Sequence, residues 1–371
     1  MGVKSPRGLL FLAALLLLGA VAYRIFGPEQ NVAVGPSFDA PTKVAGCGAS
    51  PFDEAQLAAT HEDWADAIGD EFPITNFALR SVALGEVRYD GNTRDSIPPV
   101  GVPEYVAISQ ADIGDLEPVL SIGINDDFRA YPLRILLWHE IVNDVVGGVP
   151  VLVSYCPLCN SGVVFDRRID GRVLEFGNTG RIRFHDMVMY DKGTESWWQQ
   201  AMGEAMIGDL TGTCMQPLPA RLESVARFRE RAPNGKLLVP EDADARRYGY
   251  SPFRDMEKIP PAIARNYFPY DVPDGVDHLE RVIVVGNQGW TVALIRDRGT
   301  LEAEGMVFEW VAGQNSIHDT ETIAQGRDVG NVTVQRRTPG GAVDVAHDVT
   351  FAFTFASFHP DGTLHSLATA E

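Results

Sequence analysis

The chain has 371 residues, of which 45% are hydrophobic and 22% are charged. These values are typical of a globular protein, and the length allows roughly two domains, each with a core of its own. The formal net charge of −19 argues against nucleic-acid binding, because phosphate contacts require clustered lysines and arginines. It also argues against docking of the globular surface on anionic lipids.

The N-terminus has the features of an export signal. Lys4 and Arg7 precede an apolar run over residues 9–23. A basic flank before such a run holds the N-terminus inside while the rest of the chain crosses the membrane. We therefore expect residues 1–26 to form a membrane anchor, or a signal peptide cleaved after Ala22. This segment is the membrane contact that we expect. The globular part would lie outside the cytoplasm, anchored to the membrane if the segment is retained, or secreted or periplasmic if it is cleaved.

The next stretch, residues 27–87, is predicted to be a tether and an irregular leading segment. From Leu116 onward, short runs rich in Val, Ile, Tyr and Phe alternate with turn dipeptides such as Asn125-Asp126 and Gly147-Gly148. This pattern is typical of β-hairpins. The predicted fold is therefore β-rich α+β, with antiparallel sheets and a few short helices.

Individual elements can be predicted within this region. Residues 149–155, 162–166 and 173–176 have the composition of strands. Residues 132–138 are predicted to form one or two helical turns. Residues 222–231, with apolar positions between charged ones, are predicted to form a surface helix.

Two sequence patterns suggest a diverged internal duplication. The pattern of residues 116–123 recurs over 279–286, and that of 228–237 recurs over 355–364. The two pairs occur in the same order, as expected for a repeat. We therefore divide the globular part into a main β-rich domain, 88–240, and a second β-rich half, 241–371. The second half contains no cysteine and would be a degenerate copy.

The sharpest motif is Cys156-Pro157-Leu158-Cys159. Two cysteines at this spacing can form a disulfide or share one metal ion. In thioredoxin-like proteins the pair begins a helix, whereas the sequence after Cys159 is strand-like. A turn between strands resembles a metal-binding knuckle. A closed zinc site needs four ligands, and no second cysteine pair is present, so other side chains must take part.

Several nearby side chains could complete such a site. His139 precedes the hairpin that leads into the cysteine motif, and alternation places His185 and Met187 on one strand face. Met187 is a weaker candidate, because a methionine is more often a packing residue, and Cys214 is also a weaker candidate. Cysteine, histidine and methionine together favour copper(I) over zinc, since thiolate and thioether are soft ligands.

The residues leave three functions open. The first is a copper or zinc site formed by the cysteine pair with His139 and His185. The second is thiol–disulfide redox chemistry at the cysteine pair, with His139 or Glu140 as proton acceptor. The third is a non-catalytic binding module with a structural disulfide, in which Trp197 and Trp198 contribute to a recognition surface. Substrate and partner are not indicated by any of these patterns.

A series of short motifs runs through the central part of the chain: RDxIP (94–98), AYPL (130–133), WHEIVND (138–144), GGxPV (147–151), YCPLC (155–159), VVFDR (163–167), MYD (189–191) and GxLxG (208–212). Together these motifs resemble one bacterial family, domain-of-unknown-function family 3179. The resemblance covers about residues 88–365, and it implies an exported or membrane-associated protein without an assigned activity. Members of that family typically have glycine where this chain has Asn160, and they often lack a cysteine at the position of Cys214.

Overall fold

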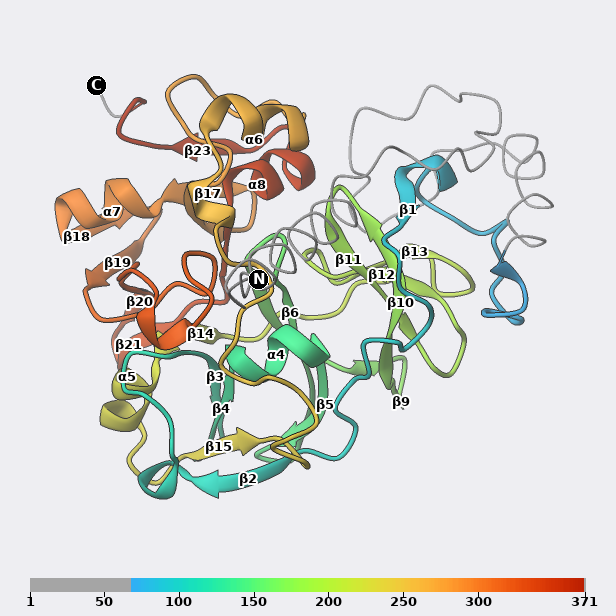
Figure 1. The fold of residues 1–371 in the computed structure, drawn as a ribbon, viewed down its shortest axis with the longest axis horizontal. Coiled ribbons are helices and arrows are strands. Elements are labelled where there is room, and N and C mark those ends of the chain that lie inside the picture. The colour runs from blue at the N-terminus through green and yellow to red at the C-terminus, as the bar shows by residue number, and fades with distance from the viewer. Residues whose placement is uncertain (1–67, 370–371) are drawn as a thin grey trace, which may run out of the picture.

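The computed structural model describes residues 68–369, which form several antiparallel sheets and a few short helices (Figure 1). This confirms the predicted β-rich α+β fold. The expected anchor or signal, residues 1–26, and most of the tether lie outside the described residues. Within 68–369, no helix combines the length and hydropathy that a bilayer crossing requires.

The first sheet has the strand order β14-β3-β4-β15-β2. Asn125 and Asp126, both with positive φ, form the predicted hairpin turn between β3 and β4. The short predicted helix is present as α4 directly after β4. The elements of this part are η1 (Leu84–Glu86), β2 (Glu104–Ala107), η2 (Ile108–Gln110), β3 (Pro118–Ile124), β4 (Asp127–Pro132), α4 (Leu133–His139), β14 (Ala220–Ser224), α5 (Val225–Arg231) and β15 (Lys236–Val239).

The predicted helix over 222–231 is only partly correct. Residues up to Ser224 belong to β14, where Leu222 and Glu223 pair with β3, and the helix begins at Val225. The Ser224 hydroxyl accepts a hydrogen bond from the Arg227 amide and so caps the helix. Pairing with a neighbouring strand therefore outweighs the helical pattern of the first three residues.

The cysteine motif lies on a three-stranded sheet, β5-β6-β7, whose strands are β5 (Ile141–Val146), β6 (Val149–Cys156) and β7 (Ser161–Asp166). Gly147 and Gly148 form the turn between β5 and β6. The predicted strands over 149–155 and 162–166 are confirmed. Residues 157–160 form the turn of the second hairpin, so Cys156, the last residue of β6, and Cys159, within the turn, lie at one end of this sheet.

A further sheet, β1-β10-β11-β12-β13, follows β7 in the chain. Its strands are β1 (Val87–Tyr89), β10 (Phe176–Arg183), β11 (Asp186–Asp191), β12 (Trp197–Gln199) and β13 (Glu204–Ile207), and a small hairpin of β8 (Arg168–Ile169) and β9 (Arg172–Val173) precedes it. The strand predicted over 173–176 is divided in the structure, because β9 ends at Val173 and β10 begins at Phe176.

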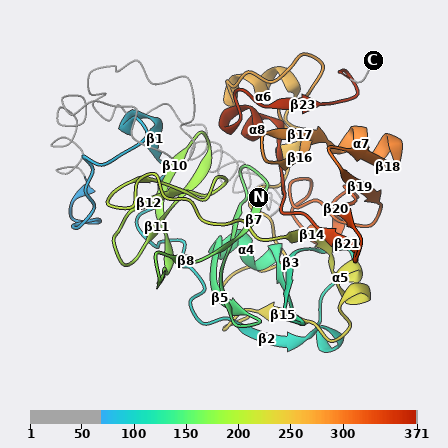
Figure 2. The same ribbon diagram turned by 180° about the vertical axis from the view of Figure 1, so that it is seen from behind.

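The second half contains a four-stranded sheet, β22-β16-β17-β23, and a meander, β18-β19-β20-β21. In Figure 2, as in Figure 1, the second half and the β10–β13 sheet lie at opposite sides of the molecule. The elements are η3 (Met256–Lys258), α6 (Pro261–Tyr267), β16 (Arg281–Val285), β17 (Gln288–Thr291), α7 (Val292–Arg298), β18 (Thr300–Ala303), β19 (Met306–Val311), η4 (Ile323–Gln325), β20 (Asn331–Thr338), β21 (Gly341–Asp344), β22 (Asp348–Phe351), α8 (Ala352–Phe358) and β23 (Thr363–His365).

The two halves share one topology. The order β14-β3-β4-β15 in the first half corresponds to β22-β16-β17-β23 in the second, and in both the last pair is parallel while the others are antiparallel. The recurring pattern of residues 116–123 falls on β3 and that of 279–286 falls on β16. The duplication stays a prediction from the sequence, and the matching topology supports it.

Candidate functional site

The cysteine turn connects the end of β6 to the start of β7. Asn160, directly after the second cysteine, has a φ of 54° and is fully buried. Glycine adopts such a backbone freely, and asparagine tolerates it better than most residues. The Asn160 amide donates to the Val349 carbonyl at 2.8 Å and accepts from the Tyr155 hydroxyl at 3.0 Å. Asparagine is therefore compatible with the backbone of this turn, and its side chain adds two buried hydrogen bonds.

The two thiols are free and almost completely buried, with 2% of Cys156 and none of Cys159 exposed. Both donate to the backbone oxygen of His185, at 3.8 Å from Cys156 and 3.2 Å from Cys159. Burial raises the pKa of Cys156 and raises that of Cys159 well above its ordinary range. Both thiols are therefore protonated at neutral pH unless a cation compensates their charge.

A third acidic group, Asp186, lies beside the sulfurs. Its carboxylate oxygen and the two Sγ atoms lie within 4.8 Å of one another, the spacing of a shared metal ion, and Asp186 is fully buried. Oδ2 accepts from Gln199 at 2.6 Å and from the Ala201 amide at 3.0 Å, whereas Oδ1 has no hydrogen-bond partner among the described residues. Burial raises the pKa of Asp186 to about 7.

The hairpin between β10 and β11 brings Asp186 to this place. Its two-residue loop, Phe184 and His185, has φ values of 53° and 66°. Such loops favour Asn-Gly, and a bulky residue at positive φ costs on the order of 1–3 kcal/mol. The conformation directs the His185 carbonyl oxygen to both sulfurs and places Asp186 at the first position of β11.

His139 lies at the end of α4, with both ring nitrogens in other contacts. Nδ1 lies 2.8 Å from the Pro98 carbonyl oxygen and Nε2 lies 2.9 Å from the Tyr248 hydroxyl. Burial lowers its pKa. Within residues 68–369, the group with metal-ligand spacing contains no histidine. The structure therefore does not bring the His139 ring to the sulfurs.

His185 is next to the sulfurs only through its backbone. The ring Nδ1 lies 2.9 Å from the Tyr270 hydroxyl, and the ring packs edge-on against Phe268 and Phe353. Burial lowers its pKa to about 4. Strand alternation placed His185 on the face of Met187, but β11 begins one residue later, and the positive φ of His185 turns its side chain away.

The three remaining residues predicted for the site, Glu140, Met187 and Cys214, do not belong to the group of possible metal ligands. Glu140 is buried, accepts from Asn178 at 2.6 Å, and has its pKa raised to about 8 by burial and by the charges of Asp90 and Asp186. The Met187 sulfur accepts from the same Asn178 amide at 3.3 Å. Cys214 is disulfide-bonded, so it is not a thiolate donor here.

The two tryptophans of β12 do not form a surface. Trp197 and Trp198 are fully buried, and the Trp198 ring donates to the Asp191 carboxylate at 3.1 Å. They are core residues, so the recognition surface predicted from them is wrong.

The cysteine-free half contributes contacts that the sequence did not indicate. The carbonyl oxygen of Cys159 accepts from the Phe351 amide at 3.0 Å and from the Thr350 hydroxyl at 2.8 Å. The buried ring of His318 lies 2.7 Å from the Pro157 carbonyl oxygen. These partners are more than 150 residues from the motif, so no local pattern could have identified them. Asp186 could have been noticed, since it adjoins His185.

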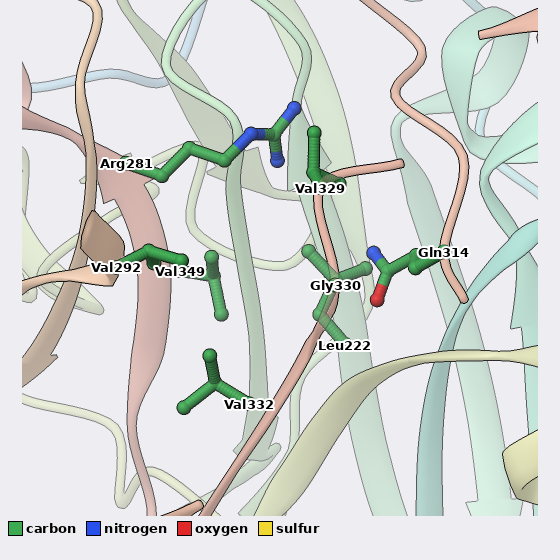
Figure 3. A pocket seen from close by; sticks show the side chains of 8 residues that line it. All are labelled: Leu222, Arg281, Val292, Gln314, Val329, Gly330, Val332 and Val349. Carbon is green, nitrogen blue, oxygen red and sulfur yellow. The ribbon is translucent and has the colours of Figure 1, made fainter. Parts of the chain in front are cut away.

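Within residues 68–369, two hollows lie away from the cysteine turn. A cavity of about 10 Å³ lies between the halves, lined by apolar side chains with Arg281 and Gln314 (Figure 3). This is roughly the space of one water molecule and too small for an organic substrate. An open groove of about 430 Å³ is lined by residues of β3, β4, β14, β20 and β21, including Phe128 and Val343. Neither hollow is lined by the cysteine turn.

Comparisons with known proteins agree with the motifs. The family described as "Protein of unknown function (DUF3179)" matches residues 94–362, which include the cysteine turn and the second half. Comparison with curated proteins gave no match, and comparison with solved structures gave none. Because the match covers most of the chain, this protein belongs to the DUF3179 family.

Proposed function

We propose that this protein is an extracytoplasmic metal-binding protein in which Cys156, Cys159 and Asp186 bind one zinc or copper(I) ion. The observation that carries the proposal is the convergence of three buried acidic side chains within 4.8 Å. One carboxylate oxygen among them, Asp186 Oδ1, has no hydrogen-bond partner within the described residues.

The electrostatics of the site support a cation. Three buried acids can ionise together only if a positive charge compensates them, since isolated buried charges are very unfavourable. A metal ion supplies that charge, and its binding releases the protons that the groups hold when it is absent. Metal affinity should therefore rise with pH.

The donor set favours zinc as the metal. The imidazole and thioether donors that favoured copper in the sequence do not belong to the group of three. Zinc accepts both thiolate and carboxylate ligands, whereas copper(I) prefers sulfur alone. Three protein ligands would leave one position of a tetrahedral zinc ion for another ligand.

The location outside the cytoplasm rests on the N-terminal sequence. Lys4 and Arg7 followed by the apolar run over 9–23 support export. The disulfide at Cys214 agrees with an oxidising compartment, where such bonds persist.

Metal analysis of the purified protein tests the proposal. We expect one zinc ion per chain in the wild type and none in Cys159→Ser, because loss of a thiolate leaves two ligands. Met187→Leu is the matched control and should retain zinc, since the Met187 sulfur contacts Asn178. A wild-type protein that takes up neither zinc nor copper(I) stoichiometrically would contradict the proposal.

A second candidate is dithiol–disulfide exchange at the same cysteines. It is favoured by two free thiols in one turn, with Asp186 and Glu140 nearby as proton acceptors. Exchange would convert the two thiols to a disulfide and reduce a partner's disulfide to two thiols. Exposures of 2% and 0% oppose attack on a partner. A reduction potential below roughly −300 mV would mark the pair as non-exchanging.

A further inference from the structure

A chain of hydrogen bonds connects the carboxylate of the proposed metal site to an arginine on the neighbouring strand. The Gln199 amide nitrogen donates to Asp186 Oδ2 at 2.6 Å, and its amide oxygen accepts from Arg183 Nη1 at 3.3 Å. Arg183 in turn donates from Nε to Glu86 at 2.7 Å. All three strands involved, β10, β11 and β12, are neighbours in one sheet.

The direction of these hydrogen bonds is fixed by the arginine. A guanidinium group only donates hydrogen bonds, so the amide oxygen of Gln199 must face Arg183. The NH₂ group of Gln199 then faces Asp186, whose Oδ2 accepts from it. Gln199 is 2% exposed, and Arg183 is held in place by Glu86, so the amide has no other favourable orientation.

This arrangement of hydrogen bonds determines which carboxylate oxygen of Asp186 is available to bind the metal ion. Oδ2 already accepts from Gln199 and from the Ala201 amide. The carboxylate therefore cannot rotate without breaking two hydrogen bonds, and Oδ1 is the oxygen left without a partner among the described residues. Groups that orient a metal ligand in this way typically change metal affinity 10- to 100-fold when they are removed.

We propose that Gln199, oriented by Arg183, is a positioning residue that holds Asp186 as the oxygen ligand and gives the cysteine pair its preference for zinc over copper(I). The inference rests on the proposed function. It assigns part of the metal selectivity to Gln199, a residue that does not itself contact the metal.

The test compares zinc and copper(I) affinities of the full chain and of Gln199→Met, which keeps the volume and removes both hydrogen bonds. Zinc affinity should fall about 10- to 100-fold. Copper(I) affinity should stay unchanged, because two thiolates suffice for that ion. Gln335→Met is the matched control. It removes a hydrogen bond to Asp344 in the β20–β21 hairpin and should leave both affinities unchanged.

A second variant separates positioning from folding. In Gln199→Glu the side chain can still accept from Arg183 but no longer donates to Asp186. It should show the same loss of zinc with normal copper(I) binding. In the cobalt(II)-loaded protein, the thiolate charge-transfer bands should persist in both variants while the ligand-field bands change.

Two results would overturn the inference: wild-type zinc affinity in both Gln199 variants, or equal losses for zinc and copper(I), which would indicate a general structural effect. Failure of the proposed function looks different. In that case the wild-type protein binds no metal, or the Cys159→Ser variant still binds it. Either result would be independent of the residue at position 199.

Discussion

At the scale of single residues, the site combines acids whose pKa values burial raises toward or above neutrality. Burial raises the pKa of Asp186 to about 7 and that of Glu140 to about 8. Asp186 lies beside the sulfurs, and Glu140 adds to the raised pKa of Cys156. Protons and a metal ion therefore compete for the same acidic side chains.

Glu140 makes stability depend on pH. Its pKa is raised from 4.5 to about 8 in the fold, so the folded state binds more protons between these values and stability falls as pH rises. Metal-free Glu140→Gln should lose the part of this decline that Glu140 causes, while the part caused by Asp186, whose pKa is raised to about 7, remains. The free energy of unfolding of the variant, relative to that of the wild type, should increase as the pH rises from 4.5 to 8. The expected increase is on the order of 1.4 kcal/mol for each unit by which the pKa of Glu140 is raised.

Denaturant unfolding of both metal-free proteins at several pH values measures this difference. Parallel pH profiles for the wild type and Glu140→Gln would contradict the assignment. The hydrogen bond from Asn178 is retained by glutamine, whose amide oxygen can accept it.

At the scale of elements, hairpin turns determine the site. The cysteine turn needs a positive φ at Asn160, and the β10–β11 turn needs one at both Phe184 and His185. The dipeptides Asn125-Asp126 and Gly147-Gly148 predicted the β3–β4 and β5–β6 hairpins correctly, because glycine and asparagine favour such backbones. The Phe184-His185 turn was missed, since neither residue favours positive φ and only the surrounding packing imposes it.

Substitutions at Asn160 should separate backbone strain from side-chain bonding. Asn160→Gly keeps the backbone but loses the hydrogen bonds to Val349 and Tyr155, which should cost about 1–3 kcal/mol. Asn160→Ala loses the same bonds and adds strain of about 1–2 kcal/mol. The free energy of unfolding should therefore decrease from the wild type to Asn160→Gly and again to Asn160→Ala. Equal stability of the two variants would contradict the strain expected at this position.

At the scale of the whole molecule, three distant parts of the chain meet at the cysteines. The turn itself belongs to β6 and β7, Asp186 comes from the sheet that follows, and β22 of the second half holds the Cys159 backbone. Although the second half has no cysteine, it supports the cysteine turn of the first half. Its role is thus larger than that of the degenerate copy suggested by its sequence.

The contact from β22 can be tested with an isosteric change. Thr350→Val removes the hydroxyl that donates to the Cys159 carbonyl oxygen, and it should lower stability by about 1 kcal/mol. Because this bond fixes the turn, zinc affinity should also fall. Thr333→Val on β20 is the matched control and should retain zinc affinity. Equal zinc binding in both variants would show that β22 does not position the turn.

The sequence by itself determined the antiparallel β-rich fold, the two central strands around the cysteine turn and the family. Alternating residues and turn dipeptides act over a few positions, so they are readable from a single chain. Only the tertiary structure decided which side chains join Cys156 and Cys159. It selected Asp186 and directed the rings of His139 and His185 elsewhere, because ligand geometry depends on packing between segments that are distant in sequence.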